Sequence, residues 1–170
     1  LDAGQKFHFM RRSTKPNIRL AHEECVEFIK ESVTKWISLM TRALSNRKGA
    51  GRRKITTVGL RREAASNMAL ALHALQDSFS PGHTKREKFI DPNFPGDISD
   101  IYIYSSQDHD KHSDDDFDSG SLNSVHAKAA ILASSELMYM AAKSVANKSV
   151  VPIDWIEFKS KWLKMSGSKI

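Results

Sequence analysis

Apolar residues recur every three or four positions through residues 17–44, which is the spacing of one face of an α-helix. Val26, Ile29 and Val33 are central members of this apolar stripe. Pro16 lies just before the segment, where a proline suits the start of a helix. The pattern therefore predicts a first helix over residues 17–44.

A second segment, residues 58–79, is dominated by alanine, leucine and methionine and predicts a deeply buried helix. The dipeptide Pro81-Gly82 follows, and it should end this helix because proline and glycine both interrupt helical structure. Between the two predicted helices, residues 45–54 contain glycine and several basic residues and predict a loop.

Residues 80–121 show no helical period and contain Pro92, Pro95 and Gly96. A loop of this length inside a compact domain is usually functional or disordered. Residues 101–104, with the sequence Ile-Tyr-Ile-Tyr, fit a brief strand, but one strand makes no sheet. We therefore expect a long irregular connection before the next helix.

An acidic run, residues 108–118, lies within this connection. An EF-hand calcium loop starting at Asp114 would need glycine at its sixth position and glutamate at its twelfth. The chain has Ser119 and Val125 at those positions, so this motif is excluded. The run remains either a solvated loop or a lid over a metal site.

Residues 122–146 predict a third helix, with Ser121 or Asn123 as its N-cap. A fourth helix should begin near Pro152, because proline is favoured at the first helical position, and should end near Lys164. The four segments together indicate an all-α fold, a multi-helix bundle with one long irregular loop.

The chain has 170 residues, which suits a single domain over residues 1–170. A domain of this size can bury a core without disulfide or metal, which favours a functional over a structural role for any metal. The single cysteine, Cys25, forms no internal disulfide. No run of about 18 apolar residues occurs, so we expect no transmembrane segment. The missing initiator methionine is typical of a processed product or of a domain excised from a longer protein.

The formal net charge is +6, and much of the excess lies in residues 47–54, Arg-Lys-Gly-Ala-Gly-Arg-Arg-Lys. A basic surface attracts phosphates of anionic lipid or of nucleic acid, and charge alone does not separate these partners. No aromatic residues are interleaved with this segment, which argues against stacking of single-stranded bases. A solvated turn is the alternative interpretation.

His73 and Asp77 lie four residues apart in the second predicted helix and therefore share one face. Together they can chelate a divalent ion, and the turn at residues 81–82 can fold His83 back toward them. Mixed imidazole and carboxylate ligands favour zinc over magnesium or calcium, which prefer oxygen. The alternative is a core histidine, an aspartate near a helix end and an unrelated loop histidine.

The stretch from Leu70 to His83, LALHALQDSFSPGH, resembles the signature of the zinc-dependent bacterial phospholipases C of the clostridial alpha-toxin and bacillus type. In that family a helix carries His-x-x-x-Asp, and a further histidine follows six residues later after a proline-containing turn, as in this chain. The family shares its fold with the fungal single-strand-specific zinc nucleases. The resemblance implies a helical hydrolase with two or three zinc ions, similar to phospholipase-C-like domains of secreted bacterial toxins and effectors.

The segment Phe7-His8-Phe9-Met10 resembles the family's His-Phe-aromatic segment, which implies that His8 binds the same zinc as His73 and Asp77. The family also uses an aspartate before this histidine as a ligand and proposed general base. Asp2 is the only acidic residue before His8, at a shorter spacing than in the family. The resemblance thus assigns Asp2 and Asp77 to the catalytic machinery.

His126 opens the third predicted helix and resembles the family's histidine that joins the second zinc. The family has a glutamate four residues later, where this chain has Ala130. The second metal would therefore be bound by other residues, or the site is reduced. The candidates in the loop are His109, Asp110, His112 and Asp114. The family's third zinc, held by the mature N-terminal amine and a nearby histidine, has no visible counterpart; His22 could contribute, although an ordinary surface histidine is the alternative.

These observations lead to three hypotheses. The first is a zinc-dependent phosphodiesterase of phospholipase C type, in which metal-activated water attacks phospholipid headgroups at a membrane surface. The second keeps the site and changes the substrate to nucleic acid, and the third is a degenerate metal-binding module without catalysis. The resemblance to toxins implies secretion or delivery out of a bacterial cell and a cognate inhibitor protein. A serine hydrolase is disfavoured, since the chain lacks the Gly-x-Ser-x-Gly motif.

Overall fold

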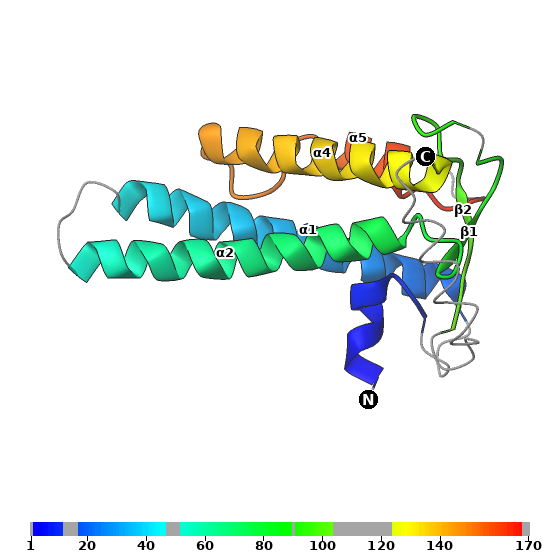
Figure 1. Ribbon diagram of the computed structural model, residues 1–170, viewed down its shortest axis with the longest axis horizontal. Coiled ribbons are helices and arrows are strands. Elements are labelled where there is room, and N and C mark those ends of the chain that lie inside the picture. The colour runs from blue at the N-terminus through cyan, green and yellow to red at the C-terminus, as the bar shows by residue number, and fades with distance from the viewer. Residues whose placement is uncertain (1, 12–16, 47–51, 90, 104–123, 168–170) are drawn as a thin grey trace.

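The computed structural model describes residues 2–11, 17–46, 52–89, 91–103 and 124–167. The described elements are η1 (Asp2–His8), α1 (Ile18–Ser45), α2 (Arg52–Asp77), β1 (Thr84–Arg86), β2 (Ile98–Ile101), α4 (Val125–Ala146) and α5 (Trp155–Trp162). The long helices α1 and α2 lie side by side as an antiparallel pair, and the two strands sit at the end where α2 finishes (Figure 1). The described part of the chain is therefore mostly helical, with one small sheet.

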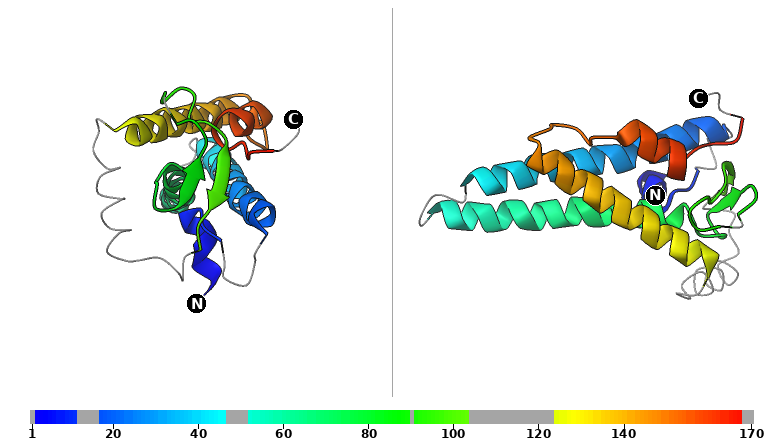
Figure 2. Two further views of the ribbon diagram at one scale, coloured as in Figure 1. Left: turned by 90° about the vertical axis from the view of Figure 1, so that its right-hand side faces the viewer. Right: turned by 90° about the horizontal axis from the view of Figure 1, so that it is seen from above.

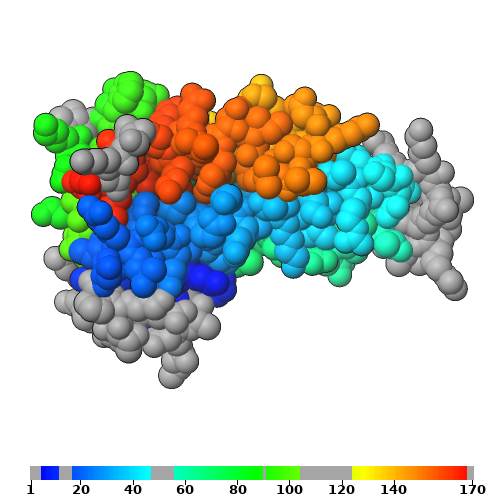
Figure 3. Space-filling view, turned by 180° about the vertical axis from the view of Figure 1, so that it is seen from behind, coloured from blue at the N-terminus to red at the C-terminus, as the bar shows by residue number. Residues whose placement is uncertain are grey.

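The elements form three layers. Helix α4 crosses one side of the α1–α2 pair obliquely, with α5 beside it, while η1 lies on the opposite side of the pair (Figure 2). From behind, α1 forms the middle of the molecule, and the α4–α5 segment covers its upper edge (Figure 3). The main core lies between these layers and includes the fully buried side chains of Phe9, Ile29, Leu75, Leu137 and Trp162.

Helix α1 confirms the first predicted helix to within one residue at each end. Its N-cap is Asn17, whose side chain accepts hydrogen bonds from the backbone N–H groups of Arg19 and Leu20 at 3.0 and 3.3 Å. This bond pattern satisfies two of the donors that a helix start leaves without an intrahelical partner. The central stripe residues Val26, Ile29 and Val33 are buried, whereas Leu44 at the end of the predicted stripe is exposed.

Helix α2 begins at Arg52 and not near residue 58, so the predicted loop over residues 45–54 was too long. Residues 55–57 contain no helix breaker, and Thr57 is buried, which extends the helix toward the N-terminus. The helix is also buried on one face only, since Ala65 is exposed. Its end at Asp77 agrees with the prediction to two residues.

A two-stranded antiparallel sheet corrects the expectation that a lone strand would find no partner. Strand β1 pairs with β2, with Thr84 opposite Ile101 and Lys85 opposite Asp100. Short bridges attach other parts of the chain to this hairpin: Arg11 pairs with Ile103, and β2 pairs with Met165 near the C-terminus. The acidic run, residues 108–118, lies outside the described residues.

Two predicted helix starts were wrong. Ser124 caps α4 by accepting from the Ala127 N–H at 3.0 Å, in place of Ser121 or Asn123. Helix α5 starts at Trp155 and not at Pro152, because Asp154 adopts a left-handed conformation with φ 62° that separates the proline from the helix. None of the described helices has the length and apolar composition needed to cross a membrane.

Candidate metal centre

His8 is presented by the 3-10 helix η1, an element that the sequence analysis did not predict. His8 is its last residue, and Phe9 then turns the chain with φ 49°. The side chains of Phe9 and Met10 are buried in the core and anchor this turn. The His8 imidazole is thereby held at the end of α2, and its side chain remains 40% exposed.

His73 and Asp77 lie on the last turn of α2. Between them, Ala74 and Leu75 are fully buried and fix which face of the helix turns toward the core. The neighbouring face carries His73 and Asp77, which share it because they are four residues apart. Their side chains are 50% and 16% exposed, so the pair borders solvent.

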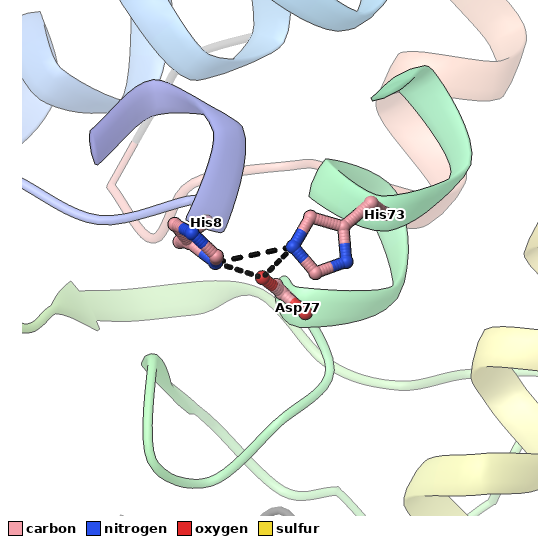
Figure 4. A group of neighbouring side chains, drawn as sticks. All are labelled: His8, His73 and Asp77. Carbon is pink, nitrogen blue, oxygen red and sulfur yellow. Dashed lines mark hydrogen bonds and ion pairs between the residues drawn. The ribbon is translucent and has the colours of Figure 1, made fainter. Parts of the chain in front are cut away.

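Three potential ligand atoms converge at this point (Figure 4). His8 Nδ1 lies 3.2 Å from Asp77 Oδ2, and His73 Nε2 lies 3.1 Å from His8 Nδ1. His73 Nε2 is also 3.5 Å from Asp77 Oδ2. In a tetrahedral zinc site with ligands at about 2.0–2.1 Å, the ligand atoms are about 3.3–3.4 Å apart. The three observed separations bracket that value.

Hydrogen bonding can account for two sides of this triangle. A carboxylate only accepts, so His8 Nδ1 and His73 Nε2 would each donate a proton to Asp77 Oδ2, at 3.2 and 3.5 Å. The two ring nitrogens, 3.1 Å apart, would then both be donors and would have no hydrogen bond to each other. A divalent cation satisfies all three atoms at once. His8, His73 and Asp77 therefore form a group that could hold a metal ion.

His83 is buried next to this group. Its side chain is 1% exposed, and its Nδ1 lies 2.5 Å from the backbone oxygen of His8 and 3.6 Å from Asp77 Oδ2. A carbonyl oxygen only accepts, so Nδ1 carries the proton and the lone pair of a neutral ring is on Nε2. His83 therefore positions His8 through its backbone, and its predicted role as a metal ligand would use Nε2.

His126 lies in a different environment. Its Nδ1 donates to the backbone oxygen of Phe79 at 3.0 Å, and its ring centre is 4.2 Å from that of Phe89. Burial lowers the pKa of His126 below its ordinary value, against the opposing effect of the Phe79 hydrogen bond. Among the described residues, the metal-binding group does not include His126. Ala130, at the position of the family's glutamate, is half-buried against the core.

The other predicted residues contribute less to the described site. Asp2 begins η1, but its side chain lies outside the described part, so its catalytic role stays a prediction. The loop candidates His109, Asp110, His112 and Asp114 also lie outside it. His22 is buried and donates from Nε2 to the Leu163 backbone oxygen at 2.6 Å, which gives it a structural role between α1 and the C-terminal segment.

Arg86, which the sequence analysis did not single out, fixes the chain just after the candidate ligands. Its Nε donates to the Ser78 backbone oxygen at 3.0 Å, and its Nη2 donates to the Ser78 hydroxyl at 3.2 Å. Ser78 follows Asp77 directly, so Arg86 holds the helix end that carries the site. No motif or period in the sequence marks this arginine.

Comparisons of the chain with protein-family models, with curated proteins and with solved structures found no match. The candidate centre is therefore defined by its own geometry. Two imidazoles and one carboxylate meet at the junction of η1 and α2, with two of the three side chains about half exposed to solvent.

Proposed function

We propose that this protein is a zinc-dependent phosphodiester hydrolase of phospholipase C type. The observation that carries this proposal is the convergence of His8 Nδ1, His73 Nε2 and Asp77 Oδ2 at tetrahedral spacings. The resemblance of residues 70–83 to the phospholipase C signature supports the choice of reaction. The chemistry of the donor set, two nitrogens and one oxygen, supports zinc over magnesium or calcium.

The exposure of the centre favours a catalytic ion over a structural one. Structural zinc sites have four protein ligands, whereas catalytic sites have three and keep one position open. The described group offers three ligand atoms, and His8 and His73 are 40% and 50% exposed on the side that faces solvent. A substrate phosphate can therefore reach this position from outside.

Three residues of the described group would bind the ion, and a fourth would orient one of these ligands. His8, His73 and Asp77 would hold the ion, and His83 would fix the His8 backbone through its Nδ1–H. A zinc ion at such a site lowers the pKa of bound water toward about 7 and polarises a phosphoryl oxygen. The Asp77 carboxylate also offers a nearby acceptor for a proton of an attacking water, a role that Asp2 would share.

We propose phospholipid as the substrate because residues 70–83 resemble the phospholipase C signature. Nucleic acid is the alternative substrate, and no aromatic residues are interleaved with residues 47–54 to stack on single-stranded bases.

Two measurements test the proposal together. The protein, purified without chelator, should contain at least about one zinc per chain by elemental analysis, as expected for one catalytic site. It should release diglyceride from phosphatidylcholine vesicles, and His73→Ala should abolish both the bound zinc and the release. Ser66→Ala, a substitution at an exposed position about two turns earlier on α2, is the matched control and should change neither.

The alternatives give different results in the same experiment. Cleavage of single-stranded DNA without diglyceride release would assign the centre to a nuclease. A purified chain with less than about one zinc would instead indicate a degenerate module. Full activity of His73→Ala would contradict any catalytic role for the group described here.

A further inference from the structure

A concave site lies along the turn that follows α2 and the strand β1. Its volume is about 170 Å³, several times the roughly 30 Å³ that a water molecule occupies in the liquid, so it can accept a group of several atoms. Among the described residues, its walls include Phe79, Lys85, Arg86, Phe89 and His126. This cavity is called the Arg86 pocket below.

Arg86 supplies a desolvated positive charge to this pocket. Its guanidinium donates to the backbone oxygens of Ser78, Gly96 and Trp162 and to the Ser78 hydroxyl, all at 2.9–3.2 Å. These four acceptors are neutral. Burial lowers the pKa of Arg86 to about 9, against the opposing effect of Asp97. Arg86 is half-buried, and no described carboxylate is in direct contact with its guanidinium.

The carboxylate that could neutralise Arg86 is engaged elsewhere. Asp97 pairs with Lys164 at 3.0 Å, and no described carboxylate lies within 4.0 Å of Arg86. A guanidinium has five N–H groups, and four take part in the hydrogen bonds given above. The remaining N–H, on Nη1, has no protein acceptor among the described residues. Arg86 therefore retains one donor and a full charge for a ligand.

Lys85 adds a second cation at the rim of the pocket. Its side chain is exposed, and it forms no ion pair with a described carboxylate, whereas Lys143 and Lys161 each lie 2.6 Å from a carboxylate oxygen. Lys85 and Arg86 thus both line the cavity, and no described carboxylate forms an ion pair with either. Such a pair favours an anion.

Aromatic side chains form part of the remaining walls. The Arg86 guanidinium lies over the Phe79 ring, 4.3 Å from its centre, and the rings of Phe89 and His126 lie 4.2 Å apart. A ligand in this pocket would therefore meet both positive charge and aromatic ring surface. This combination fits an anion that carries an apolar substituent.

We propose that the Arg86 pocket binds the phosphoryl group of a phosphate ester, with the apolar part of the ester against Phe79 and Phe89. The preference for a phosphoryl group over a carboxylate rests on the proposed phosphodiesterase function, whereas the binding of an anion does not. Phe79 follows Asp77 by two residues, so this subsite adjoins the centre where hydrolysis would occur.

Calorimetric titration of the full chain with phenyl phosphate and with inorganic phosphate tests this inference. Lys85→Gln should weaken binding of both ligands about tenfold, as expected for the loss of one hydrogen bond to a charged group. Phe89→Leu should weaken phenyl phosphate binding and leave inorganic phosphate binding unchanged. Arg42→Gln removes the same charge from an exposed residue near the far end of α1 and should change neither.

The controls decide between the pocket and its competitors. If Lys85→Gln and Arg42→Gln weaken binding equally, the effect is one of net charge and the proposal is overturned. The proposal is also overturned if neither phenyl phosphate nor inorganic phosphate binds. Loss of binding in His73→Ala would place the anion at the metal centre instead. Binding that persists in His73→Ala would support the pocket. If the unaltered protein also releases no diglyceride, the proposed function is refuted while the pocket stands.

Two further ligands identify the source of the phosphate. A short-chain phosphatidic acid carries the phosphoryl group on an acylglycerol, and a nucleoside monophosphate carries it on a sugar with an aromatic base. Tighter binding of the first would assign the pocket to lipid phosphate, and tighter binding of the second to nucleotide phosphate. Either result supports the pocket if Lys85→Gln weakens the binding of that ligand. If Lys85→Gln weakens the binding of neither ligand, the proposal is overturned.

Discussion

Asp77 is the carboxylate on which the candidate centre depends. Its Oδ2 atom lies 3.2 Å from His8 Nδ1 and 3.5 Å from His73 Nε2. It also lies 3.6 Å from His83 Nδ1. The substitution Asp77→Asn keeps the size of the side chain and removes its charge. Because zinc sites use carboxylate and not amide oxygens, we expect the variant to lose most of its affinity for zinc.

The expected effect on thermal stability follows from ligand binding to the folded state. At a free zinc concentration 100 times the dissociation constant, binding stabilises the native protein by about 2.7 kcal/mol. In a domain of this size, each kcal/mol changes the melting temperature by about 2–4 °C, so zinc should raise it by roughly 5–11 °C. If Asp77→Asn raises the dissociation constant about 100-fold, the same zinc contributes only about 0.4 kcal/mol and roughly 1 °C.

Differential scanning calorimetry of chelator-treated protein, with and without added zinc, measures this difference. The matched control is Glu63→Gln, which changes a carboxylate to an amide on the same helix, at an exposed position paired with Lys35. This control should respond to zinc as the unaltered protein does. An equal rise for Asp77→Asn and Glu63→Gln, or no rise for the unaltered protein, would refute the assignment of Asp77 as a metal ligand.

Three further predictions concern the framework of the site. Gly96→Ala should lower the melting temperature, because the left-handed φ of 74° costs about 1–2 kcal/mol for alanine and the new Cβ would lie 1.6 Å from the Glu87 backbone oxygen. Burial lowers the pKa of His22, so the unfolded state binds more protons as the pH falls through about 6.5. Stability in chelator should therefore fall on acidification, and His22→Gln should reduce that slope in urea unfolding at several pH values. Burial raises the pKa of the Cys25 thiol to about 12, so iodoacetamide should label it only after unfolding; prompt labelling of the native protein would contradict this.

The long helices could be predicted from sequence because their signals are local and repeated. The stripe of α1 extends over seven turns and is preceded by a capping residue, Asn17, so small errors in single positions do not matter. The end of α2 was marked by Pro81-Gly82. Strand β1, by contrast, is three residues long, which is too short to show an alternating pattern, and its pairing with β2 depends on tertiary contacts.

Only part of the candidate site could be predicted from local sequence patterns. The spacing of His73 and Asp77 is a local helical signal that can be recognised directly in the sequence. His8 lies 65 residues before His73, and no local pattern connects them, so only the family resemblance suggested the pairing that the structure shows. Arg86 was missed because its acceptors are the backbone oxygens of Ser78, Gly96 and Trp162, and a backbone oxygen is present in every residue type.

His8 and His73 lie on two different elements, η1 and α2, and this has a consequence for metal loading. A cation shared by His8 and His73 would act as a removable cross-link between η1 and α2. Zinc binding and the packing of η1 against α2 would stabilise each other by the same free energy. A contact that holds η1 in place would therefore raise the affinity for zinc. One such contact is the bond from Arg11 Nε to the Ile101 backbone oxygen at 2.7 Å. Weakening it would make the protein release zinc more readily while every ligand stayed intact.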